Sequence, residues 1–324
     1  MTVNVGDTVT AAQYNNLQQD VALILGPGNE TFGYGQSLAS STVSIGTTIN
    51  ADHMNVLKTD LDKISNHQLD LVATGLEGVN LDVNNTGNII KAGSTGDAIA
   101  RTFNDYKQAI ANLDTNSGVN VGSRFTAHPN QMTLDTAQQI QYTSNWNGTI
   151  DSEQTITFAG ASGSGGAGYN DRRYFFNTGG EIRFYATLTH NGSNKSKDWS
   201  DLLAAMGTIK FNHTATTCTG TGTTSTVGAY DLGFNTWTTI FEKSGGINSY
   251  GVNYSENKYI IQAKFLGSTT SNQIQFKIIL QDNDTGDPNY DEDVGGTLYA
   301  YIQSYRATGN NVAVVAPSIS MGGF

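Results

Sequence analysis

The hydrophobic residues near the start of the chain follow a helical spacing, and they do so in two matching segments. The segment that begins at Thr2 aligns without a gap with the segment that begins at Thr42, an offset of forty residues that indicates an internal repeat. In each copy a short extended stretch precedes apolar residues three and four positions apart, which is typical of one helix face. These residues are Tyr14, Leu17, Val21 and Ile24 in the first copy, and Met54, Leu57, Leu61 and Ile64 in the second.

Polar residues mark where these helices begin. Thr10 is followed three positions later by Gln13, the arrangement of a capping box, and Asn50 is suited to cap the second helix. The run Gly26-Pro27-Gly28 predicts the end of the first helix. We therefore expect a duplicated strand-helix attachment region over residues 1–70.

A third amphipathic segment follows, with apolar residues spaced four, three, four and three from Ile99 to Leu113. Such a pattern is too short to establish a coiled coil, and each helix face can pack either within its own chain or against another subunit. Three narrow apolar faces in one region favour subunit contacts, with residues 71–117 as a connector. The predicted oligomer contacts are Tyr14, Leu17, Val21, Met54, Leu57, Leu61, Ile99, Phe103, Tyr106 and Ile110.

From about residue 118 the hydrophobic pattern alternates with a period of two, which predicts strands. Clusters of Gly, Asn, Asp and Ser separate these runs, one short helix interrupts at 198–206, and 311–320 predicts a final strand. The predicted class is α+β: a small N-terminal helical repeat region, followed by a mainly antiparallel β-sandwich, jelly-roll-like, over residues 118–324. The clearest strands are 155–158, 181–188, 236–241, 259–265, 273–280 and 297–302.

Two local features of this second region carry specific expectations. Phe175 and Phe176 predict a strand that turns at 177–180 and pairs back onto 181–188 as a hairpin. Trp146 and Trp199 are expected to be anchors of the core.

Composition and charge argue against several classes of protein. Charged residues make up 14% of the chain, below the roughly 25% of ordinary globular proteins. The net charge is −11 and no Lys/Arg cluster is present, so we expect neither nucleic-acid binding nor attraction to anionic membranes. Cys218 has no second cysteine with which to form a disulfide. No signal peptide and no apolar run of membrane-spanning length are seen, so we expect no membrane insertion.

Motifs of catalysis and metal binding are weak. Gly163-x-Gly165-x-x-Gly168 matches a dinucleotide fingerprint, but its surroundings predict no strand-to-helix turn. The stretch 282–293 is rich in oxygen ligands, and Asp282, Asp284 and Asp287 form a weak calcium candidate, although a polar hairpin loop is the favoured interpretation. With no nucleophile elbow, P-loop or paired histidines, we expect no enzyme and no cofactor besides that candidate calcium.

Tyrosines gather in the last quarter of the chain, among them Tyr299, Tyr301 and Tyr305. Aromatic rings beside Asn and Asp suit carbohydrate recognition, since they offer a flat apolar surface next to hydrogen-bonding groups. The alternative, core or cross-strand packing, is favoured for any single tyrosine. The possible glycan contacts are Tyr250, Tyr254 and Tyr290.

A resemblance to a known group of proteins is carried by 146–149, 173–183, Asp198-Trp199 with Leu202-Leu203, 207–209, and Gly33-Tyr34-Gly35-Gln36 between the helix copies. These segments resemble virion structural proteins of marine tailed phages, particularly those that infect cyanobacteria. The resemblance implies a place in the particle, but not which place. The helical repeat, the low charge and the richness in Gly, Asn and Thr favour a self-associating fibre or appendage subunit of the tail, neck or baseplate, assembled with other virion proteins. Three-fold symmetry is the natural expectation for such parts.

Two alternatives share this scaffold: a host-receptor protein that binds surface glycan, and a capsid decoration protein. A polysaccharide-degrading tailspike is disfavoured, because its usual β-helix would show regular short repeats that the second half lacks.

Overall fold

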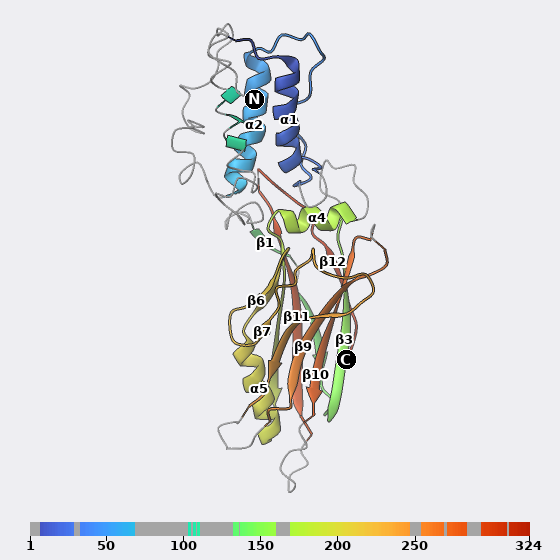
Figure 1. The fold of residues 1–324 in the computed structure, drawn as a ribbon. Coiled ribbons are helices and arrows are strands. Elements are labelled where there is room, and N and C mark those ends of the chain that lie inside the picture. The colour runs from blue at the N-terminus through green and yellow to red at the C-terminus, as the bar shows by residue number, and fades with distance from the viewer. Residues whose placement is uncertain are drawn as a thin grey trace. The chain divides into compact units, whose positions relative to one another are not determined.

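The computed structural model describes residues 7–28, 33–68, 103–104, 106–107, 109–110, 132–135, 137–159, 169–246, 254–268, 271–283, 293–309 and 311–324, without the side chains of 169 and 170. These residues form an α+β fold of helices and two antiparallel sheets, as predicted (Figure 1). Within the described part of the chain, no helix is both long and apolar enough to cross a membrane.

The chain divides into two compact units, which we name the helical unit and the sandwich unit. The helical unit comprises Met1–Thr133, Gly160–Gly179 and Arg306–Val315, and the sandwich unit comprises Leu134–Ala159, Gly180–Tyr305 and Ala316–Phe324. The predicted boundaries at 70 and 117 differ from this division, because the helical unit takes two segments from the range assigned to the sandwich. Both segments carry apolar residues that the helical unit buries, among them Phe176 and Val312.

The two repeat copies form α1 (Ala11–Ile24) and α2 (Ala51–His67), which lie side by side in the helical unit (Figure 1). The capping box of Thr10 and Gln13 is present, and Asn50 caps α2 in the same way through His53. The predicted helix starts are therefore confirmed.

Side chains of both helices fix the segment that connects them. The buried carboxylate of Asp60 accepts hydrogen bonds from the backbone N–H of Ala39 at 2.8 Å, the N–H of Ser40 at 2.8 Å and the Ser40 hydroxyl at 2.7 Å. The amide of Asn15 both donates to and accepts from the backbone of Val43. These bonds replace the ladder that an extended segment would have in a sheet.

The segment predicted as a hairpin strand is instead a helix, α4 (Tyr169–Asn177). Tyr174, Phe175 and Phe176 are buried in the helical unit, and Gly179 follows with a positive φ of 87° that ends the helix. The Asn177 amide donates to the carbonyl of Gly33 at 2.7 Å. Burial on several sides has overridden the β-propensity of the sequence Tyr-Phe-Phe, so the hairpin prediction was wrong.

The helical unit is closed by two further contacts. The guanidinium of Arg173 donates to the carbonyl of Pro27. Gly35, whose φ is +68°, lies so close to the ring of Tyr174 that a Cβ atom at this position would meet the ring at 2.5 Å. A glycine is therefore required there for both reasons.

The sandwich unit contains two antiparallel sheets. The six strands that the sequence predicted most clearly are present, with bounds that differ from the predicted ranges. The first sheet has the order β1 (Met132–Leu134), β11 (Gly296–Ala307), β4 (Glu181–His190), β5 (Ile209–Phe211) and β6 (Thr216–Cys218), with β2 (Gln138–Tyr142) also paired to β11. The second has the order β12 (Ser318–Met321), β3 (Gly148–Thr157), β10 (Gln273–Asp282), β9 (Lys258–Phe265), β8 (Thr238–Ser244) and β7 (Thr223–Thr224).

The core of this unit is formed by the alternating inward-facing residues of both sheets. The ring of Phe276 on β10 lies 5.0 Å from that of Phe184 and 5.2 Å from that of Phe211, which belong to the first sheet. All three are fully buried. The two sheets therefore pack face to face as a β-sandwich, as the alternation predicted.

One helix, α5 (Asn194–Met206), packs along β4, where the hydroxyl of Ser200 donates to the carbonyl of Leu188. Trp199 on this helix is fully buried and meets Trp146 edge to face at 6.1 Å. Both tryptophans are core anchors, as predicted. The tail differs in part, since the last strand occupies only Ser318–Met321.

Candidate functional site

The outward face of the first sheet carries a row of tyrosines from β4 and β11. Tyr185 lies directly opposite Tyr301 in the antiparallel register, and their rings stack at 4.3 Å with 8° between the planes. Tyr299 follows on the same face, 6.4 Å from Tyr301. The residues between them, such as Ala300, are buried in the core, so the tyrosines point the other way and are partly exposed.

An arginine extends this aromatic row along β4. The guanidinium of Arg183 lies 3.5 Å from the centre of the Tyr305 ring, a cation–π arrangement. Its Nη2 is also 2.8 Å from Oε2 of Glu181, which occupies the register position opposite Tyr305. Arg183 is thus held flat against a ring and has its charge balanced by a neighbouring carboxylate.

Polar side chains flank the rings on both neighbouring strands. Gln141 and Gln139 of β2 lie opposite Tyr299 and Tyr301, and both are exposed. Thr187 of β4, also exposed, lies opposite Tyr299. We call this surface the aromatic face and define it as Tyr185, Tyr299, Tyr301, Tyr305 and Arg183, with Gln139, Gln141 and Thr187 beside them.

The phenol of Tyr185 acts as a hydrogen-bonding group in its neutral form. Burial raises the pKa of Tyr185 above its ordinary value, and the neighbouring phenols of Tyr301 and Tyr305 raise it further. A neutral phenol both donates and accepts a hydrogen bond. The face therefore offers flat apolar rings, phenol hydroxyls and side-chain amides next to one another.

The glycan contacts predicted from the sequence are elsewhere or outside the described residues. Tyr254 is only 4% exposed, and its carbonyl accepts from the backbone of Asn257, so it is not a surface residue. Tyr250 and Tyr290 lie outside the described residues.

Sequence reasoning missed Tyr185 as a member of the face. The available signal was the even spacing of Arg183 and Tyr185 on one strand, together with that of Tyr299, Tyr301 and Tyr305 on another, because residues two apart share a side of a sheet.

The apolar helix faces that were predicted to contact other subunits, here called the helical stripes, are covered within one chain. None of the described members is more than 6% exposed, and Ile99 lies outside the described residues. An apolar stripe indicates that a helix face is buried, but it does not indicate whether the same chain or another chain covers it. These side chains form the core of the helical unit rather than a surface for a partner: Tyr14, Leu17, Val21, Met54, Leu57, Leu61, Phe103, Tyr106 and Ile110.

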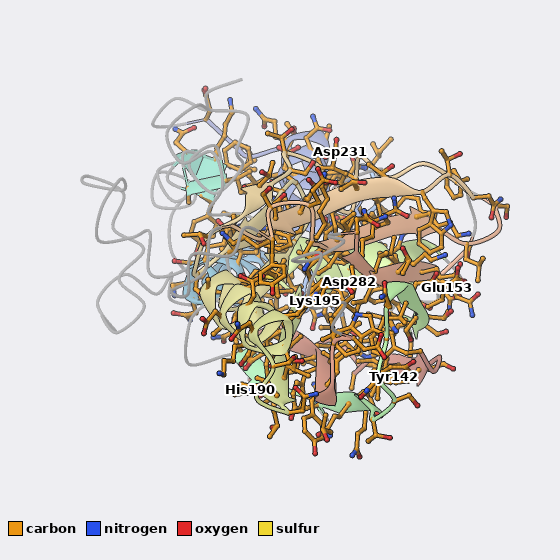
Figure 2. The ribbon with its side chains drawn as sticks, turned by 90° about the horizontal axis from the view of Figure 1, so that it is seen from below. Tyr142, Glu153, His190, Lys195, Asp231 and Asp282 are labelled. Carbon is orange, nitrogen blue, oxygen red and sulfur yellow. The ribbon has the colours of Figure 1, made fainter. Side chains whose placement is uncertain are left out.

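The calcium candidate also has a different environment from the one expected. The carboxylate of Asp282 is buried and lies 2.9 Å from Nζ of Lys195, beside which Figure 2 shows it. Asp284 and Asp287 lie outside the described residues. Among the residues that are described, no group of three or more His, Cys, Asp or Glu side chains is placed to hold a metal ion. Asp282 is therefore engaged with a cation that the chain itself supplies.

No protein-family model, no curated protein and no solved structure matches this chain. What the molecule does must therefore be inferred from its own residues and their arrangement.

Proposed function

We propose that this protein is a structural appendage subunit of a tailed-phage particle and that its sandwich unit binds carbohydrate on the host surface. The observation that supports binding is the aromatic face, where a stacked pair of tyrosines lies beside exposed amides of β2. The place in a particle rests on the resemblance described above. The expected trimer stays a prediction, and it would have to use surfaces other than the buried helical stripes.

The physical case for carbohydrate is complementarity of shape and polarity. A sugar ring has an apolar C–H face that fits a tyrosine ring, and hydroxyls at its rim that suit amides and phenols. Tyrosine has few rotatable bonds, so little conformational entropy is lost when it is immobilised. On this face the rings are already held, since Tyr185 stacks on Tyr301 and Arg183 lies over Tyr305.

Charge indicates the class of glycan. The chain has a net charge of −11, so an anionic polysaccharide would meet an unfavourable field. The arginine of the face is already paired with Glu181 at 2.8 Å. A neutral glycan is therefore the favoured ligand.

The same arrangement favours binding over cleavage. Glycoside hydrolysis commonly needs two carboxyl groups roughly 5 to 10 Å apart, one of them able to donate a proton. Glu181, beside Tyr305, forms an ion pair with Arg183 at 2.8 Å. A carboxylate that is paired with a cation is poorly suited to donate a proton.

The test is binding of a neutral-glycan array and of purified host polysaccharide by wild-type protein and by Tyr301→Ala. Removing a ring worth about 1.5 kcal/mol of stacking should weaken binding about tenfold. Trp237→Ala is the matched control, because it removes a half-buried aromatic ring that does not belong to the aromatic face. The ring centre of Trp237 lies 4.1 Å from Nζ of Lys264, a residue of β9 in the second sheet. Equal binding by wild-type and Tyr301→Ala, or loss of binding in the control alone, would exclude the aromatic face as the site.

Membership of a particle is tested separately. Light scattering of the purified chain should give a mass near three times 34.6 kDa if the protein is a trimeric appendage. Labelled antibodies against the chain should bind intact particles at the tail, neck or baseplate. A chain that stays monomeric and that antibodies detect only on the head would instead indicate a decoration protein.

A further inference from the structure

A lysine and an aspartate meet inside the sandwich unit, where neither is reached by solvent. Lys195 is the second residue of α5, and Asp282 is the last residue of β10. Nζ of Lys195 lies 2.9 Å from Oδ2 of Asp282 (Figure 2). The side chain of Lys195 is 1% exposed and that of Asp282 is 0% exposed. The pair joins a helix packed along the first sheet to a strand of the second sheet.

As an ion pair, this contact is costly. Lysine and aspartate are almost never fully buried, and the desolvation of each ion costs several kcal/mol that mutual attraction often fails to repay. Lys195 is also in the first turn of a helix, where the macrodipole opposes a positive charge. Trp199, one turn further along α5, is fully buried and shares this side of the helix. A reaction that removes both charges would relieve each of these costs.

The backbone holds both residues in place. The hydroxyl of Ser193 caps α5, and the Ser196 hydroxyl accepts from the N–H of Gly295 at 2.8 Å. Asp282 is fixed by the register of β10 with β3, where it lies opposite Gly148. Two reacting groups held in contact in this way have a high effective concentration, which favours bond formation between them.

We propose that Lys195 and Asp282 condense to form an intramolecular isopeptide bond. Nζ of Lys195 attacks Cγ of Asp282, a C–N bond forms, and one carboxylate oxygen leaves. Of the three protons on the ammonium group, one stays on the amide nitrogen and two leave with that oxygen as water. The reaction needs no oxidant, reductant or cofactor. Nζ has only to move from contact to the amide bond length of about 1.33 Å from Cγ.

Asp198 is the candidate to carry the proton between the two atoms, because it is a buried carboxyl group on the same helix as Lys195. It lies three residues after Lys195 on α5, so the two side chains share one side of the helix. It is 6% exposed, and its Oδ2 lies beside Gly245. Its carboxyl group would accept a proton from the nitrogen and return it to the leaving oxygen, the role of a general acid and base.

The test is the intact mass of the full chain under denaturing conditions. Wild-type protein should be lighter than its sequence mass by one water molecule, whereas Lys195→Ala and Asp282→Ala should have the full mass of their sequences. Trypsin should release a branched peptide that joins 184–197 to 278–306, because cleavage after a cross-linked Lys195 is blocked. Both measurements are made on unfolded chains, so the wild-type result does not depend on how well the variants fold.

The full sequence mass in the wild-type chain would overturn the proposal and leave a plain ion pair. A water deficit that persists in both alanine variants would also overturn it, because the water would then have been lost elsewhere. Asp198→Asn should contain chains of full mass. If it shows the complete deficit instead, Asp198 is not the proton relay.

Discussion

Asp60 offers the sharpest test of how the duplicated helices are held. Its carboxylate is fully buried in α2 and accepts three hydrogen bonds, one at Oδ1 from Ala39 and two at Oδ2 from Ser40. Asp60→Asn keeps the shape but replaces one oxygen by an NH₂ group. Whichever way the amide turns, at least one backbone N–H then faces another donor.

The expected loss in the free energy of unfolding follows from the hydrogen bonds that Asp60→Asn removes. A hydrogen bond to a charged group contributes about 1.5 to 3 kcal/mol, and a buried donor left without a partner costs about 1 to 3 kcal/mol. We therefore expect Asp60→Asn to destabilise the helical unit by about 3 kcal/mol. Ser40→Ala removes one of the three bonds, so it should cost only about 1 kcal/mol.

The repeat supplies a matched control. Asp20 is the counterpart of Asp60 in the first copy and is exposed, so Asp20→Asn should change stability by less than about 0.5 kcal/mol. Amide hydrogen exchange of residues 39 and 40 reports the local opening of the segment that connects α1 and α2. Urea unfolding followed by circular dichroism reports the free energy of unfolding of the whole protein. Equal stability of wild-type and Asp60→Asn, or an equal loss in Asp20→Asn, would show that the carboxylate does not hold the connecting segment.

Three further predictions concern the sandwich unit. Phe276→Ala, which removes the ring between Phe184 and Phe211, should lower the free energy of unfolding by about 3 to 5 kcal/mol in urea titrations, whereas an unchanged value would contradict the face-to-face packing. Tyr259→Phe should raise the melting temperature or leave it unchanged, because the buried Tyr259 hydroxyl has no hydrogen-bond partner within the described residues, and a clear drop would reveal a partner. Burial lowers the pKa of His213 to about 4, with partial compensation by Asp231, so the folded state favours neutral histidine. Its contribution to stability is therefore present above the unfolded pKa of about 6.5 and is lost as pH falls from there towards 4. Between these two pH values the melting temperature of His213→Gln should fall less steeply with decreasing pH than that of the wild type. An equal slope would show that His213 is not the source of the pH dependence.

Local signals in the sequence predicted much of the fold. The capping residues Thr10 and Asn50 were identifiable because a helix start leaves N–H groups that a nearby side-chain oxygen must accept. The sandwich strands were identifiable because a half-buried strand alternates polar and apolar residues. Both signals lie within a few residues of the structure that they specify.

Features that depend on distant partners were not predictable in the same way. Phe175 and Phe176 have a high β-propensity, yet burial in the helical unit makes them part of α4. The stripe that includes Leu57 and Leu61 gave no indication of whether its cover came from the same chain. The pairing of Lys195 with Asp282 and of Tyr185 with Tyr301 depends on strand order, which no local pattern of one sequence encodes.

The interleaving of the two units has a consequence for inheritance. The chain passes from one unit to the other five times, at 133/134, 159/160, 179/180, 305/306 and 315/316. A single genetic crossover therefore cannot exchange one unit for a foreign version, since every breakpoint between the first and last passages divides at least one of them. Variants of the aromatic face should arise by point substitution on a conserved frame, and the two units should be found together as one inherited block.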